Sequence, residues 1–276
     1  MLYKKIKNNL NKILVKFIKN IKALRPIIRK LKIGSFEFRL SINALKRMQY
    51  AYICFQAAKL GKKLGYKKIS VLEYGVAGGQ GLLILEEHIL EIEKYFDIQI
   101  EIYGFDTGEG LPEPIDYRDL PYHWKKGFYS MNQEDLKGKL RKSKLIIGNI
   151  KDTSLNFFKD HDPAPIGAVI HDFDFYSSTK TALGMMIGNE KFFLPRVFSY
   201  FDDTIGDELE LYNDYTGERL AINEFNMLNK DIKICIPYHL LALKPEVWHH
   251  QIWICHFFKH LKYNDFISNE DQKLDI

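Results

Sequence analysis

Four glycines follow a short apolar run in the stretch Val71-Leu72-Glu73-Tyr74-Gly75-Val76-Ala77-Gly78-Gly79-Gln80-Gly81. Glycine permits positive φ and lets a ligand approach the main chain closely, so this pattern predicts a strand, a binding loop and the start of a helix. The spacing is Glu-x-Gly-x-x-x-Gly-x-Gly, from Glu73 through Gly75 and Gly79 to Gly81. Dinucleotide-binding loops have Gly-x-Gly-x-x-Gly instead, so the stretch predicts another ligand.

Acidic and amide side chains follow the later apolar runs of the sequence. They are Asp106, Asn149, the pair Asp172 and Asp174, and the pair Asp202 and Asp203. In parallel sheets the carboxyl ends of the strands meet at one edge, where ligands bind, and a carboxylate there suits the paired hydroxyls of a ribose. Any one of these acids is equally well explained as a helix cap or a loop residue. Their joint placement predicts a single site.

Three of the acids also predict a metal site. Asp172, Asp202 and Asp203 end two neighbouring strands, and such ends lie roughly 5 Å apart in a sheet. Carboxylates this close repel each other unless they are protonated or neutralised, and oxygen ligands suit Mg²⁺ or another divalent cation. The alternative is that Asp174 or Asp203 only caps the helix that follows.

The elements that must position these residues alternate regularly from residue 69 onward. Apolar patterning predicts strands and helices in turn, which implies a mainly parallel sheet covered on both faces. The expected strands are 69–74, 98–105, 144–148, 166–171, 197–201, 232–236 and 247–257, and the expected helices are 41–64, 80–96, 132–142, 152–160, 178–190 and 217–229. A polar loop is expected over 107–131.

The first part of the chain has a different composition from the rest. Eleven of the 40 Lys and Arg residues lie in residues 1–33, which hold no acid, and the remaining 29 face 35 acidic residues. Apolar residues at steps of three and four predict an amphipathic helix over 3–24, which Pro26 should end or kink. We expect residues 1–33 to be a basic helical extension and residues 34–276 to be one domain with its core at 66–258.

The basic extension predicts either a peripheral contact with an anionic membrane or packing on the body or on a second subunit. The mildly acidic remainder argues against a nucleic-acid partner. Three widely spaced cysteines predict no disulfide, which fits a reducing, cytoplasmic location. No apolar run approaches the roughly 18 residues of a membrane span, and the N-terminus does not resemble a cleaved secretion signal.

Several segments together resemble a known family. The glycine loop is similar to the first motif of class I S-adenosylmethionine-dependent methyltransferases. More specifically, four segments resemble the macrocin O-methyltransferase type in both their order and their spacing. They are Gly104-Phe-Asp106-Thr-Gly-Glu109-Gly110-Leu-Pro112-Glu-Pro114, Gly148-Asn149-Ile-Lys-Asp152-Thr153, His171-Asp172-Phe-Asp174-Phe-Tyr176-Ser177-Ser178-Thr179 and Phe201-Asp202-Asp203. The resemblance covers about residues 66–230.

That resemblance implies a Rossmann-like α/β fold whose sheet has seven strands, the last of them antiparallel. It implies S-adenosylmethionine as methyl donor and Mg²⁺ near the accepting hydroxyl. Carried over by position, Glu73, Gly75 and Gly79 should lie along the methionine part of the cofactor, with Gly81 also binding the cofactor. Asp106 should bind the ribose and Asn149 should lie near the adenine. Asp172, Asp202 and Asp203 hold the metal.

The expected chemistry is transfer of the methyl group to a hydroxyl, preferably that of a sugar in a glycan, glycolipid or nucleotide sugar. The protein must align the acceptor and remove its proton, and Asp174, His171 and His123 are the candidate bases. For each histidine the alternative is an ordinary core or surface residue.

Two other functions explain part of the sequence. Asp172-Phe-Asp174 is an Asp-x-Asp motif of the kind with which glycosyltransferases hold a metal and a sugar diphosphate, although it leaves the glycine loop and Asp106 unexplained. A non-catalytic protein of the same fold, acting through its basic helix, is the third hypothesis.

Overall fold

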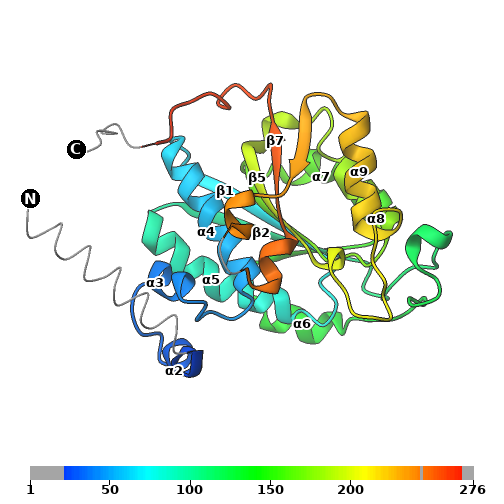
Figure 1. The fold of residues 1–276 in the computed structure, drawn as a ribbon, viewed down its shortest axis with the longest axis horizontal. Helices are drawn as coiled ribbons and strands as arrows, with labels where there is room; N and C mark the ends of the chain where they lie inside the picture. The colour runs from blue at the N-terminus through cyan, green and yellow to red at the C-terminus, as the bar shows by residue number, and fades with distance from the viewer. Residues whose placement is uncertain (1–21, 243–244, 269–276) are drawn as a thin grey trace, which may run out of the picture.

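A computed structural model describes residues 22–242 and 245–268, which form one seven-stranded sheet with helices on both faces (Figure 1). The strand order is β3-β2-β1-β4-β5-β7-β6, and β7 is antiparallel to both of its neighbours while the other pairings are parallel. The expected Rossmann-like fold is therefore confirmed. The strands are β1 (Lys68–Tyr74), β2 (Gln99–Asp106), β3 (Lys144–Ile147), β4 (Ile166–His171), β5 (Phe193–Phe201), β6 (Ile232–Cys235) and β7 (Ile252–Phe257).

Helices cover the sheet because its central strands are apolar on both faces. In β1, Ile69 and Val71 pack in the same core as α4 and α5, whereas Leu72 and Tyr74 pack in the core that holds α8 and α9. The helices are α2 (Arg25–Lys30), α3 (Phe36–Ser41), α4 (Met48–Lys63), α5 (Gln80–Phe96), α6 (Gln133–Lys139), α7 (Ile150–His161), α8 (Tyr176–Gly184), α9 (Gly217–Leu228) and α10 (Tyr238–Leu241).

The strand order reverses between β1 and β4. From β1 the chain adds β2 and β3 on one side, and β4 and β5 then build the other side. Two backbone hydrogen bonds hold the ends of β1, β2 and β4 together. Gly75 N–H donates to Phe105 O at 3.0 Å, and Asp172 N–H donates to Tyr74 O at 3.1 Å. A crevice at the carboxyl ends of strands where the order reverses is the usual ligand site of such sheets.

Several expected boundaries were wrong. The helix expected from residue 41 begins at Met48, because Arg47 adopts a left-handed conformation with φ 37° that interrupts the chain between α3 and α4. The strand expected from 247 begins at Ile252, because residues 247–251 form a 3₁₀ turn with a capping box between Glu246 and His249. The helix expected to reach 190 ends at Gly184. Hydrophobic pattern is insensitive to such local caps.

The predicted helix 3–24 lies outside the described residues except for 22–24, a 3₁₀ turn. Pro26 stands in the first turn of α2, where its missing N–H costs nothing. Within the described ranges, no helix has the length and apolar character needed to cross a membrane.

Candidate functional site

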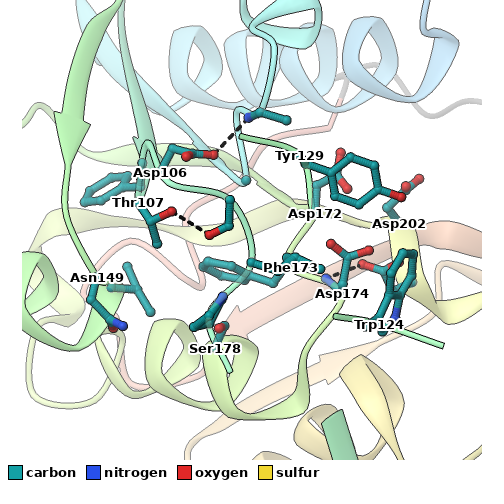
Figure 2. Close-up of a pocket in the computed structure, with 18 of the residues that line it drawn as sticks. Asp106, Thr107, Trp124, Tyr129, Asn149, Asp172, Phe173, Asp174, Ser178 and Asp202 are labelled. Atoms are coloured by element: carbon teal, nitrogen blue, oxygen red, sulfur yellow. Dashed lines mark hydrogen bonds between the residues drawn. The ribbon is translucent and has the colours of Figure 1, made fainter. Parts of the chain in front are cut away.

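A cavity of about 340 Å³ opens at the carboxyl ends of the central strands. Each of the five expected strand ends contributes to its lining: Gly75 from β1, Asp106 from β2, Asn149 after β3, Asp172 after β4 and Asp202 after β5. Figure 2 shows Asp106 and Asn149 toward one end of the cavity, and Asp172, Asp174 and Asp202 with Tyr129 and Trp124 toward the other. The cavity therefore has two chemically distinct ends.

At the first end, Asp106 ties the glycine loop to β2. Its Oδ2 accepts a hydrogen bond from Ala77 N–H at 2.9 Å and its Oδ1 accepts one from Gly108 N–H at 2.7 Å. Asn149 caps α7, because its Oδ1 accepts a hydrogen bond from Lys151 N–H at 3.0 Å. Both side chains line the cavity while they hold its wall in place.

The glycines of the loop serve different purposes. Gly75 lines the cavity with φ 78°, and a Cβ there would stand 1.7 Å from Asp172 O. Gly79 and Gly81 do not line the cavity. A Cβ on Gly79 would lie 2.2 Å from the Leu136 side chain, and a Cβ on Gly81 would lie 2.2 Å from Glu73 Oε1. Packing against the protein thus accounts for these two glycines, which the sequence had assigned to the cofactor.

Glu73 is also absent from the cavity lining and lies behind the loop. Its side chain is 1% exposed, its Oε1 accepts a hydrogen bond from the Tyr50 hydroxyl at 3.0 Å, and its Oε2 is buried without a partner. Burial raises the pKa of Glu73 to about 8, against the opposing effects of the Tyr50 hydrogen bond and of Arg47. The carboxyl group consequently favours its neutral form.

At the second end the acids lie close enough to perturb one another. Burial, and then the charges of Asp202 and Asp203, raise the pKa of Asp172 well above its ordinary range. Burial, and then the charges of Asp203 and Asp202, raise the pKa of Asp174 to about 9. Burial, and then the charge of Asp202, raise the pKa of Asp203 to about 7. Asp174 is 7% exposed and has φ 61°. A left-handed, buried acid facing a cavity is typical of a functional position.

The three predicted metal ligands differ in what occupies their oxygens. Asp172 accepts no hydrogen bond from the described residues, and Asp202 accepts through Oδ1, from Tyr200 and Gln251. Both oxygens of Asp203 accept, from Asp174 N–H and from the Tyr212 hydroxyl, each at 2.8 Å.

As these side chains lie, no three His, Cys, Asp or Glu groups in the described ranges surround a cation position. Carboxylate oxygens keep further lone pairs and are the ligands that hard cations prefer. The residue types therefore suit Mg²⁺, while their arrangement does not enclose it.

The two histidines predicted as bases are not in the cavity lining. His171 is 0% exposed, stacks on Phe201 with ring centroids 4.1 Å apart, and has no partner on either ring nitrogen. Burial lowers its pKa to about 3. His123 is half-buried, and its Nε2 lies 3.8 Å from Glu210 Oε1. Of the three candidate bases, only Asp174 faces the cavity.

Two loops close the second end. The Tyr122 hydroxyl donates to Glu210 O at 2.6 Å, which ties the loop 107–131 to the segment 204–218. Trp124 and Tyr129 from the first loop and Glu210 from the second line the cavity. Sequence reasoning missed Tyr129, which has φ 63°, because loop conformation carries no hydrophobic period. Ser178, in the first turn of α8, also lines the cavity.

Searches with the sequence match no protein-family model and no curated protein. Solved structures with a similar fold include calicheamicin methyltransferase CalS11, with 19% identity over 77% of this chain and 80% of that one, at TM-score 0.49. Cofactor-bound Rv0187 from MTB has 13% identity over 77% and 81% at TM-score 0.44, and a Bacillus cereus O-methyltransferase in complex with SAH has 12% over 86% and 98% at 0.40. These scores are low, so the functional argument depends on the site of this chain.

Proposed function

We propose that the protein is an S-adenosylmethionine-dependent O-methyltransferase that methylates a hydroxyl of a sugar. The observation that carries the proposal is one continuous cavity. It joins Asp106, Asn149 and Gly75 to the acids and aromatic side chains around Asp174 (Figure 2). A cofactor site and an acceptor site must adjoin in this way for direct group transfer.

The first end suits the cofactor. A carboxylate at the end of β2, beside a glycine loop, is placed to accept hydrogen bonds from ribose hydroxyls, and Asp106 keeps lone pairs for them beyond its two backbone bonds. Gly75 leaves main chain exposed to the cavity because no side chain fits there. Asn149 and Ile150 provide a polar and an apolar contact for a purine base.

The second end suits acceptor activation. S-adenosylmethionine supplies a methyl group that its sulfonium already makes electrophilic, so the protein needs mainly to align an acceptor oxygen and remove its proton. Asp174 faces the cavity without a side-chain hydrogen bond from the described residues and is our candidate for the group that takes the proton. Trp124 and Glu210, from two loops, line this end of the cavity, where loop closure over a bound acceptor would exclude water.

The charge of the lining supports one kind of acceptor. Six acids line the cavity, and no Lys, Arg or His of the described chain does: Asp106, Asp172, Asp174, Asp202, Asp203 and Glu210. Phosphate groups are repelled by such a surface, whereas Trp124 and Tyr129 offer faces on which a sugar ring can stack. Among the acceptors considered, we therefore favour a glycan or glycolipid sugar over a nucleotide sugar.

We also propose that Asp172 and Asp202, with Asp203, hold a divalent cation. A bound Mg²⁺ supplies Lewis acidity that lowers the pKa of a hydroxyl. Calorimetric titration of the protein with MgCl₂ tests this part separately from activity. Binding that is lost in Asp202→Ala supports it, and equal heats for the two proteins contradict it.

Calorimetric titration with S-adenosylhomocysteine tests the proposed cofactor. Micromolar binding that is lost in Asp106→Ala, but kept in Glu109→Ala at an exposed position in the loop that follows β2, supports the methyltransferase. Binding of a nucleotide sugar alone supports the glycosyltransferase reading of Asp172 and Asp174, and binding of neither supports a non-catalytic protein. Labelled S-adenosylmethionine with candidate sugars then identifies the acceptor.

The membrane contact of residues 1–33 stays a proposal. Within the described part, the apolar residues Leu24, Ile27, Leu31 and Ile33 are exposed beside Arg29 and Lys30. An apolar face flanked by cations suits an anionic bilayer. Sedimentation with vesicles that contain phosphatidylserine tests it: binding that salt or removal of residues 1–33 abolishes is the expected result.

A further inference from the structure

The first turn of α4 packs behind the site, against residues of β1 and β5. Tyr50 donates from its hydroxyl to Glu73 Oε1 at 3.0 Å, and its ring centroid lies 5.8 Å from that of Tyr200. Gln49 Nε2 donates to the Tyr200 hydroxyl at 3.3 Å, and Tyr200 donates to Asp202. The start of this helix therefore contacts the ends of both β1 and β5.

Arg47 stands at the N-cap of this helix, and its guanidinium interacts electrostatically with this group of acids. Its Nη1 donates to the Tyr50 hydroxyl at 3.3 Å, and its Cζ lies 5.0 Å from the centre of the Tyr50 ring. The guanidinium is thus two hydrogen bonds away from Glu73. Its charge interacts with Asp172 and Glu73, on the two strands that flank the crevice.

This cation is held near carboxylates without forming an ion pair in the described part of the chain. No carboxylate oxygen there lies within 4.0 Å of its nitrogens, since every ion pair of the described residues involves other cations. Among the described residues, one of its five guanidinium N–H groups donates a hydrogen bond, to the Tyr50 hydroxyl. The planar fork that binds a carboxylate bidentately is therefore still available.

The backbone of Arg47 is also unusual. It has φ 37° and ψ 67°, a left-handed conformation that costs a non-glycine residue about 1 kcal/mol or more, and its side chain does not cap the helix. With this conformation at its N-cap, α4 begins where the Arg47 side chain contacts Tyr50 and interacts electrostatically with the acids. Local strain of this kind is often maintained where it places a functional group.

We propose that Arg47 binds the α-carboxylate of the methionine part of S-adenosylmethionine. The inference rests on the proposed function, together with the placement of the methionine part along the glycine loop that the sequence resemblance implies. The charge of Arg47 acts on Glu73 and Asp172, and the two strand ends that carry these acids meet at Gly75, which lines the cavity. The methionine end of the cofactor is therefore the end assigned to Arg47. Among the described residues that line the cavity, none supplies a cation for that carboxylate.

Two ligands that differ in the methionine part test the proposal. S-adenosylhomocysteine carries the α-carboxylate, whereas 5′-methylthioadenosine has the same adenosine and sulfur but no amino-acid part. Arg47→Met is expected to weaken S-adenosylhomocysteine binding about 10- to 100-fold, as loss of a charge-assisted hydrogen bond does. Binding of 5′-methylthioadenosine should change less than about threefold. Arg47→Lys should lie between wild type and Arg47→Met for the first ligand.

Arg141→Met, which removes an exposed cation from the chain, is the matched control and should bind both ligands as wild type does. Equal losses for the two ligands in Arg47→Met would mean a general effect on the fold and would overturn the proposal, as would unchanged binding of both. If wild type binds no S-adenosylhomocysteine, the proposed function itself fails. If wild type binds S-adenosylhomocysteine and Arg47→Met weakens the binding of both ligands equally, only the proposed role of Arg47 is wrong.

Discussion

Gly75 and the carbonyl oxygen of Asp172 approach so closely that a Cβ on Gly75 would stand 1.7 Å from that oxygen. The contact joins the ends of β1 and β4 at the point where the strand order reverses. It fixes the position of Asp172 relative to the glycine loop. The cofactor end and the acidic end of the cavity therefore meet at this pair.

Gly75→Ala is expected to destabilise the protein by at least about 2 kcal/mol, because alanine meets both this clash and the penalty of φ 78°. Gly78→Ala is the matched control, since nothing lies within 4 Å of a Cβ there and no positive φ is required. Urea denaturation of the two variants measures the difference. Equal midpoints would show that the strand ends separate without cost.

Asp174→Asn should lower kcat about 100-fold or more while it leaves the affinity for S-adenosylhomocysteine unchanged, because the amide cannot accept the proton of the acceptor. Burial, then Asp203 and Asp202, raise the pKa of Asp174 to about 9, so the wild-type rate should increase as pH rises toward that value. The variant should lose this increase. Asp214→Asn, at an exposed side chain, is the control, and a full rate in Asp174→Asn would exclude Asp174 as the base.

Glu73→Gln should change how stability depends on pH. Burial raises the folded-state pKa of Glu73 from 4.5 to about 8, so the neutral form is favoured on folding. The resulting contribution of Glu73 to the free energy of unfolding is fully present below the unfolded-state pKa of 4.5 and is lost as pH rises through about 8. The free energy of unfolding of wild type should thus fall relative to Glu73→Gln across that range. Glu87→Gln, at an exposed position, should show no such trend, and a constant Glu73→Gln difference would contradict the shift.

His171→Phe should keep kcat within about threefold of wild type, since His171 is 0% exposed and outside the cavity lining. The new ring preserves the stacking on Phe201 and removes two ring nitrogens that have no partner. Initial rates measured well below the melting temperature test this. A loss of 100-fold with intact folding would restore His171 as a candidate base.

The sequence alone determined the sheet and most of the strand-end residues. Alternating apolar runs specify buried parallel strands, and polar residues that end such strands must meet at one edge, so Asp106, Asn149, Asp172 and Asp202 were predictable as neighbours. The seven-strand topology followed from the resemblance of the motifs and agrees with the observed order.

Only the tertiary structure decided which predicted residues face the cavity. A strand alternates its side chains between two faces, and the chain beyond the strand then turns, so Asp174 points into the cavity while His171 stacks on Phe201 in the core. Gly79 and Gly81 accommodate Leu136 and Glu73, contacts between residues far apart in sequence. Arg47 contacts Tyr50 from a left-handed position at the start of α4, and that conformation leaves no mark on hydrophobic periodicity.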